Sequence, residues 1–166
     1  VDFDEDRKYS RLVKAAMRAM APQIEDRGID EIYLDLTELV AARLPDDDEA
    51  VDADDAEQNV WWCARELAGE LKQAVRTATG LGCSIGVAPN KLIAKIASEL
   101  DKPDGLTVVT HKDVATRLWP LSVRRLHGVG PKSAAKLARL GIATIGELAQ
   151  AERQWLARHF GARYAD

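Results

Sequence analysis

The segment Gly128-Val129-Gly130-Pro131 constrains the fold of this chain more than any other feature. Two glycines separated by one residue allow a tight turn, because glycine adopts backbone angles that other residues avoid. Pro131 suits the first position of a helix, where the missing N–H leaves no hydrogen bond unmade. The pattern predicts a turn leading into a helix over residues 131–139. Backbone N–H groups that converge at a helix N-terminus form a binding site for an anion.

Residues on both sides of the turn indicate that this anion is a DNA phosphate. Lys132 and Lys136 lie one helical turn apart and can add salt-dependent contacts to phosphates. Apolar residues can pack the flanking helices together: Val123, Leu126, Leu137, Leu140, Ile142 and Leu148. The segment is similar to the helix-hairpin-helix module, which holds a duplex backbone without reading its bases. We therefore predict a DNA-binding set of Gly128, Val129, Gly130, Lys132, Ser133 and Lys136. The alternative is a helix connector without a ligand.

The charge of the chain is distributed unevenly. The net charge is −4, but eight acids lie between Asp46 and Glu57 with no basic residue among them. From Lys102 to Arg163, 11 Lys and Arg residues stand against four acids. A basic C-terminal part suits phosphate contacts, although charge alone indicates a solvated helical surface equally well.

The hydrophobic periodicity predicts an α+β first part and an all-helical second part. Before residue 110 we expect helices over 6–21, 59–79 and 91–100, a hairpin whose second strand spans 29–37, an acidic loop over 43–57, and strands over 83–87 and 106–109. These elements favour a mostly antiparallel sheet with helices on one face. Beyond that point we expect helices over 111–118, 121–126, 131–139, 144–150 and 152–159. The sequence thus predicts two domains, 1–110 and 111–166.

A six-residue stretch of the predicted hairpin strand contains three acids: Asp30, Glu31 and Asp35. Acids are poor strand formers, so three together indicate that something compensates their charge. A hard cation such as Mg²⁺ would do so, because it binds carboxylate oxygens and substrate phosphates together. The alternative is that Asp30 and Glu31 are turn residues following Gly28. We interpret Lys91 and Lys95 as part of a solvated helix face rather than as a ligand site.

The two cysteines lack metal-ligand spacing, which is typical of reduced thiols in a cytosolic protein. We therefore expect a cytoplasmic location. No apolar run approaches the roughly 18 residues of a membrane span, and the first ten residues are too acidic for a signal peptide. We therefore expect no membrane association. The sequence has no initiator Met, and its pattern of predicted elements is cut off at both ends. These features indicate a fragment.

Four stretches occur in an order that resembles the Y-family translesion DNA polymerases. They are GIDEIYLDLT (28–37), GCSIGVAPNKLIAKIASELDKPDGL (82–106), LHGVGPKSAAKLARLGIATIGELA (126–149) and HFG (159–161). The second stretch is strongly specific, whereas the third is shared with many DNA repair proteins. The resemblance implies a partial polymerase palm followed by a small thumb with the helix-hairpin-helix motif.

The resemblance also implies roles for individual residues. Asp30 matches a metal-binding aspartate and Glu31 the adjacent catalytic glutamate, so both would serve two-metal nucleotidyl transfer with Mg²⁺. Lys102 matches a lysine that holds the triphosphate of the incoming deoxynucleoside triphosphate. The hairpin Gly128–Ser133 matches the thumb's contact with the backbone of the primer-template DNA.

The chain departs from the family pattern at Gly28, where Ser is usual, and at Ile32, where Ala is usual. The family's first metal-binding aspartate and its fingers would precede Val1. Its little finger, with any peptide that binds the sliding clamp, would follow Asp166. We therefore expect the isolated fragment to be inactive. One alternative is a non-catalytic polymerase relative, a DNA-binding accessory protein, although such a scaffold has no need of Asp30, Glu31 and Lys102. Another is a plain DNA-binding module.

Overall fold

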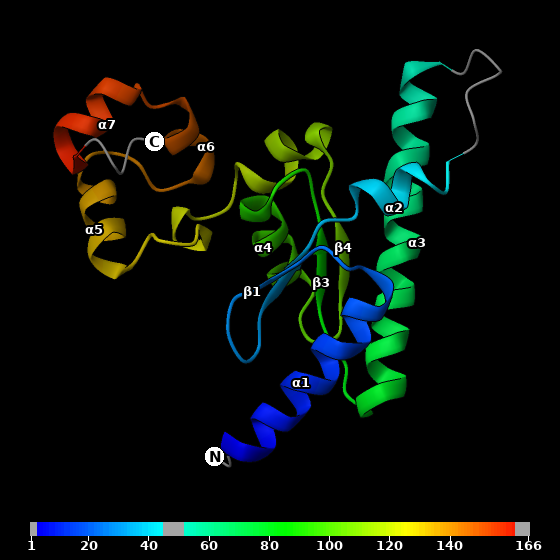
Figure 1. Ribbon diagram of the computed structural model, residues 1–166. Helices are drawn as coiled ribbons and strands as arrows, with labels where there is room; N and C mark the ends of the chain where they lie inside the picture. Colours follow the sequence, from blue (N-terminus) through cyan, green and yellow to red (C-terminus); the bar gives the residue numbers. More distant parts are fainter. Residues whose placement is uncertain (1–2, 45–51, 162–166) are drawn as a thin grey trace. The chain divides into compact units, whose positions relative to one another are not determined.

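The computed structural model describes residues 3–44 and 52–161 (Figure 1). The chain divides into two compact units, residues 1–109 and residues 110–166. The first unit combines helices with short strands. The second is helical, and its described residues contain no strand, only an isolated antiparallel bridge between Ser122 and Thr144.

Two long helices support the first unit. The first helix, α1 (Phe3–Met20), carries acids in its first turn and packs on α3 (Ala53–Thr79). Met17 of α1 is buried together with Leu71 and Val75 of α3. Helix α3 ends where Gly80 adopts a left-handed conformation with φ of 74°. Both predicted helices are confirmed.

Helix α3 begins earlier than the sequence indicated. The acidic loop was expected to extend to residue 57, yet the helix starts at Ala53, and the carboxylate of Asp52 accepts a hydrogen bond from the backbone N–H of Asp54. Acidic residues are favourable in the first helical turn, because the N-terminus of a helix carries a partial positive charge. The centre of the expected loop, 45–51, lies outside the described residues.

The strands of the first unit form two separate two-stranded sheets within the described ranges. Strands β1 (Ile24–Asp26) and β2 (Ile32–Leu34) pair antiparallel as the expected hairpin. Strands β3 (Ile85–Val87) and β4 (Leu106–Val108) pair parallel and are joined by α4 (Lys91–Leu100). The α+β class is confirmed, but half of the observed pairing is parallel. The β3–α4–β4 crossover explains the difference, because parallel neighbours need such a connection.

The second hairpin strand is shorter than the predicted 29–37. The Asp35 carboxylate accepts hydrogen bonds from the backbone N–H and the hydroxyl of Thr37, at 2.9 and 2.6 Å. These bonds turn the chain out of the strand and into a short helix, α2 (Thr37–Ala41). Aspartate competes for backbone groups in this way at turns.

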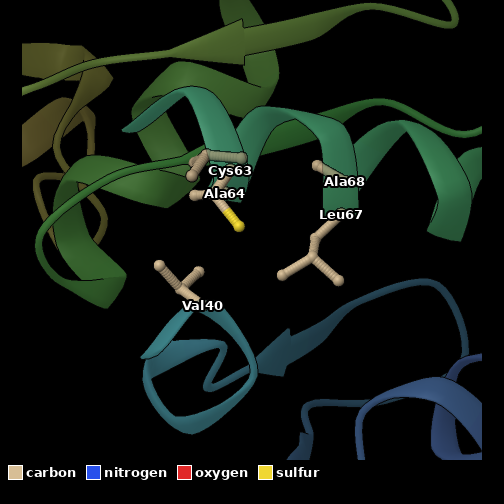
Figure 2. Close-up of a cluster of buried hydrophobic side chains, with 6 residues drawn as sticks. Val40, Cys63, Ala64, Leu67 and Ala68 are labelled. Carbon is tan, nitrogen blue, oxygen red and sulfur yellow. The ribbon is translucent and has the colours of Figure 1, made fainter. Parts of the chain in front are cut away.

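The α2 helix completes a buried apolar cluster against α3. Figure 2 shows Val40 pointing toward Cys63, Ala64 and Leu67. Val87 of β3 belongs to the same cluster, so the core links the helices to the parallel sheet. Helix α4 lies very close to β3 because Gly86 has no side chain: a Cβ there would stand 2.1 Å from the carbonyl oxygen of Ala94.

The second unit contains short helices around its own core. Two 3₁₀ turns (His111–Asp113 and Val123–Arg125) and a π-helical turn (Val114–Leu118) precede α5 (Pro131–Arg139), α6 (Ile145–Gln150) and α7 (Arg153–Phe160). The buried cluster consists of Val123, Leu137, Ile142 and Leu156. The predicted helix over 131–139 matches α5 at both ends.

Candidate functional site

Asp30 and Glu31 lie in the loop of the β1–β2 hairpin, immediately before β2. The backbone N–H of Arg27 donates to the carbonyl of Glu31 at 3.0 Å and closes this loop. Lys14 of α1 donates to the carboxylate of Asp26 at 2.9 Å and also to the carbonyl of Gly28. The Asp30 side chain is exposed, whereas the Glu31 side chain is 28% exposed. The two acids are therefore presented by a fixed turn rather than by a long strand.

Glu31 pairs with Lys95, a residue that sequence reasoning placed on a solvated helix face. The ammonium of Lys95 lies 2.6 Å from Glu31 Oε2, and its side chain is only 27% exposed. The hydrogen bond with Glu31 is the largest cause of a raised pKa for Lys95, and Glu99 adds to it. Lys91, one turn earlier, pairs with Glu25 instead. Helical spacing could have revealed a shared face for Lys91 and Lys95, but not the carboxylates opposite that face.

Lys102 joins the same group of charges through Glu99. Its ammonium lies 2.8 Å from Glu99 Oε1, and the Lys95 ammonium lies 3.3 Å from the same oxygen. The hydrogen bond from Lys102 is the largest cause of a lowered pKa for Glu99. Asp30, Glu31, Lys95 and Lys102 also line one pocket of the first unit. The structure thus joins one predicted acid, Glu31, to the predicted triphosphate lysine through Lys95 and Glu99.

Asp35, the third acid, has a different environment. The Asp35 carboxylate accepts a hydrogen bond from the Thr37 hydroxyl, and this bond is the largest cause of the lowered pKa of Asp35. The hydrogen bonds from Thr37 are the main stabilisation of its charge, and the nearby Lys91 adds to them. Asp35 is therefore a turn-forming residue.

The glycine turn of the second unit is formed by Gly128 rather than by Gly130. Gly128 has φ of 91°, which favours glycine, whereas Gly130 has φ of −75°, which any residue adopts. The N–H of Val129 donates to the carbonyl of Leu126 at 3.1 Å, and Pro131 has no N–H. The first turn of α5 therefore presents the N–H groups of Lys132 and Ser133, which have no acceptor in the described part of the chain.

The two lysines of this segment have different environments. Lys132 is exposed, and the described residues offer its ammonium no partner. Lys136 donates to the carbonyl of His159, and its ammonium lies 4.6 Å from the centroid of the Phe160 ring. Upstream of the turn, the expected helix over 121–126 is a single 3₁₀ turn at Val123–Arg125. Ser122 caps that turn and also forms the bridge to Thr144, which limits its length.

The fold defined by these units is that of solved Y-family DNA polymerases. The crystal structure of DinB from Sulfolobus solfataricus superimposes with a TM-score of 0.79 over 99% of this chain and 43% of that chain, at 27% identity. An insertion ternary complex of Dbh DNA polymerase gives a TM-score of 0.81 with the same coverage and identity.

The chain belongs to the impB/mucB/samB family, whose sequence model matches residues 1–99, and the family's HHH motif matches residues 111–142. Its curated relatives include DNA polymerase IV of Moorella thermoacetica, 38% identical over 93% of this chain and 34% of that protein. DNA polymerase IV 1 of Bacillus subtilis is 38% identical over 96% of this chain and 34% of its own length. The chain thus spans about a third of these relatives. The family resemblance inferred from the four motifs is confirmed.

Proposed function

We propose that this chain is the palm and thumb portion of a DNA-directed DNA polymerase used in translesion synthesis and DNA repair. The observation that carries the proposal is the Glu31–Lys95–Glu99–Lys102 group, which joins the hairpin acid Glu31 to the predicted triphosphate lysine. Polymerisation needs a carboxylate-bound cation and a cationic contact to the triphosphate at one place. Relatives named DNA polymerase IV support the same reaction.

Asp30 and Glu31 are proposed as the catalytic residues that hold Mg²⁺. In the described ranges, no three His, Cys, Asp or Glu side chains cluster as metal ligands. Two carboxylates nevertheless fit Mg²⁺, which is usually held by one or two carboxylates together with water and substrate phosphates. The chemistry that such cations supply is activation of the primer hydroxyl and stabilisation of the leaving pyrophosphate. Lys102 binds the triphosphate of the deoxynucleotide as a point charge.

The glycine hairpin is proposed as the contact with the backbone of the primer-template DNA. Its residues are Gly128, Val129, Gly130, Lys132, Ser133 and Lys136. The N–H groups of Lys132 and Ser133, which have no acceptor among the described residues, and the exposed side chain of Lys132 support this role. Lys136 would first have to leave Phe160 and the His159 carbonyl.

We further propose that residues 1–110 form the palm and residues 111–166 the thumb, and that the protein acts in the cytoplasm. The two compact units support the division. No helix of the described residues is long and apolar enough to cross a membrane. A sliding clamp as a partner of the full-length protein stays a prediction from the family resemblance.

Primer extension by a full-length polymerase containing this chain tests the proposal. Asp30→Ala should abolish extension and leave the affinity for primer-template DNA nearly unchanged. Asp35→Asn is the control, because it removes a neighbouring negative charge but keeps an oxygen that can accept from Thr37. Extension by Asp30→Ala at the wild-type rate would remove the catalytic assignment. A wild-type protein that binds DNA but never extends a primer would favour the accessory protein.

A further inference from the structure

One carboxylate oxygen of α4 is shared by two ammonium groups. Glu99 Oε1 lies 3.3 Å from the Lys95 nitrogen and 2.8 Å from the Lys102 nitrogen. The two cations are therefore close enough for a single anionic oxygen to bridge them. A linear triphosphate carries several such oxygens on adjacent phosphorus atoms.

The backbone that carries these lysines is fixed. Helix α4 lies against β3 through Gly86, where a Cβ would meet backbone atoms. At the end of α4 the Asp101 carboxylate accepts a hydrogen bond of 2.8 Å from the hydroxyl of Thr107, a buried residue of β4. The side chains nevertheless reach solvent, with exposed fractions of 27% for Lys95 and 53% for Lys102. The pair is thus both positioned and accessible.

We propose that Lys95 is a second triphosphate-binding cation beside Lys102, and that Glu99 occupies the place of a phosphate oxygen until the nucleotide displaces it. This inference rests on the proposed function of the same site. Glu31, Lys95, Glu99 and Lys102 together carry no net charge, so an incoming triphosphate is attracted only when a carboxylate moves away. Binding of a cation to Glu31 would free Lys95 from its ion pair with Glu31.

Removing the Glu99 charge should therefore strengthen binding of the phosphate chain. The Glu99→Gln side chain keeps its length and its ability to accept a hydrogen bond, but it no longer repels phosphate. With charges several ångströms apart near a protein surface, we expect roughly a three- to tenfold gain in affinity. Lys95→Met should weaken binding by a similar factor, and Lys102→Met likewise.

The experiment is a calorimetric titration of the 166-residue chain with tripolyphosphate in the presence of EDTA, so that cation binding cannot contribute. Glu70→Gln is the matched control for Glu99→Gln, because Glu70 of α3 also pairs with a basic residue, Arg43, at 2.7 Å. Lys8→Met controls for the loss of one exposed lysine. Orthophosphate, which carries fewer negative charges than tripolyphosphate, should bind more weakly. Circular dichroism establishes that each variant is folded.

The expected result is tighter binding for Glu99→Gln than for Glu70→Gln, and weaker binding for Lys95→Met than for Lys8→Met. Equal affinities within either pair, or no detectable binding to wild type and Glu99→Gln, overturn the inference. If Lys102→Met alone weakens binding, the inference fails while the proposed role of Lys102 stands. If neither Lys95→Met nor Lys102→Met weakens binding, both this inference and the proposed role of Lys102 fail.

Discussion

Lys72 and Asp104 connect the middle of α3 to the loop that follows Lys102. The Lys72 ammonium lies 2.7 Å from the Asp104 carboxylate, and it also donates to the carbonyls of Cys83 at 2.6 Å and Gly105 at 3.3 Å. Arg76, one turn along α3, lies 2.6 Å from the other carboxylate oxygen of Asp104. Two basic residues of one helix thus fix both chain segments that lead into β3 and β4.

Lys72→Met should destabilise the first unit. The change leaves the part-buried Cys83 carbonyl without this donor, which costs about 1–3 kcal/mol of unfolding free energy, whereas the Gly105 carbonyl still accepts from the N–H of Ile85. Urea unfolding followed by circular dichroism measures the loss. Arg65→Met, at an exposed position of the same helix, is the control and should change stability by less than about 0.5 kcal/mol. Equal losses for the two variants would mean that the Lys72 contacts contribute nothing.

Gly128 and Gly130 should respond differently to the same substitution. Gly128→Ala places a side chain at φ of 91°, a strain of order 1–3 kcal/mol, and should lower the urea midpoint. Gly130 has φ of −75° and open space around its Cβ position, so Gly130→Ala should fold normally. The added methyl group should still hinder a phosphate approaching the start of α5, so binding of a labelled DNA duplex should weaken. An unstable Gly130→Ala variant would contradict the observed turn.

Local signals in the sequence predicted several element ends correctly. Pro131 marks the first turn of α5, and Asn90 caps α4 by accepting from the N–H of Ile93 at 2.9 Å. Both effects depend only on neighbouring residues. The residue with positive φ could not be chosen from the sequence, because both Gly128 and Gly130 allow it.

Contacts between distant parts of the chain were not predictable from spacing. Lys95 and Glu31 are 64 residues apart, and only the packing of α4 beside the hairpin brings them together. The sequence thus predicted Glu31 and Lys102 as separate site residues but missed Lys95 and Glu99, which connect them. Asp35 was included with the acids of the site because its hydrogen bonds to Thr37 depend on the turn, which a strand pattern conceals.

Lys132 and Lys136 should contribute unequally to DNA binding. Lys132 is exposed, so Lys132→Ala should weaken binding evenly across DNA sequences. The slope of the logarithm of the binding constant against the logarithm of the salt concentration should fall in magnitude by about one unit. Lys136 is already engaged by the His159 carbonyl and the Phe160 ring, so Lys136→Ala should change the slope less. Titrating a labelled duplex at several salt concentrations measures both slopes. A salt-independent affinity, or no effect of Lys132→Ala, would mean that the hairpin is only a connector.

The capping of α6 should make the stability of the second unit depend on pH. The Glu147 carboxylate accepts from the backbone N–H of Ala143 at 2.7 Å and of Thr144 at 2.9 Å, and these bonds lower its pKa in the folded chain. A lowered folded pKa means that the unfolded chain binds the proton first. The stabilisation is therefore complete above the unfolded pKa of about 4.3 and is lost as pH falls through the lower, folded value.

Glu147→Gln isolates this contribution, because it removes the titrating carboxylate but keeps an acceptor oxygen. The variant should melt below the wild type at neutral pH, and the difference should shrink as pH falls below about 4. Methyl NMR signals of Leu137 and Ile142, both buried in the second unit, follow the melting of that unit alone. Glu152→Gln is the control, because the Glu152 side chain makes no capping bond at the start of α7. A melting difference that stays constant between neutral and acidic pH would show that the Glu147 charge does not stabilise the cap.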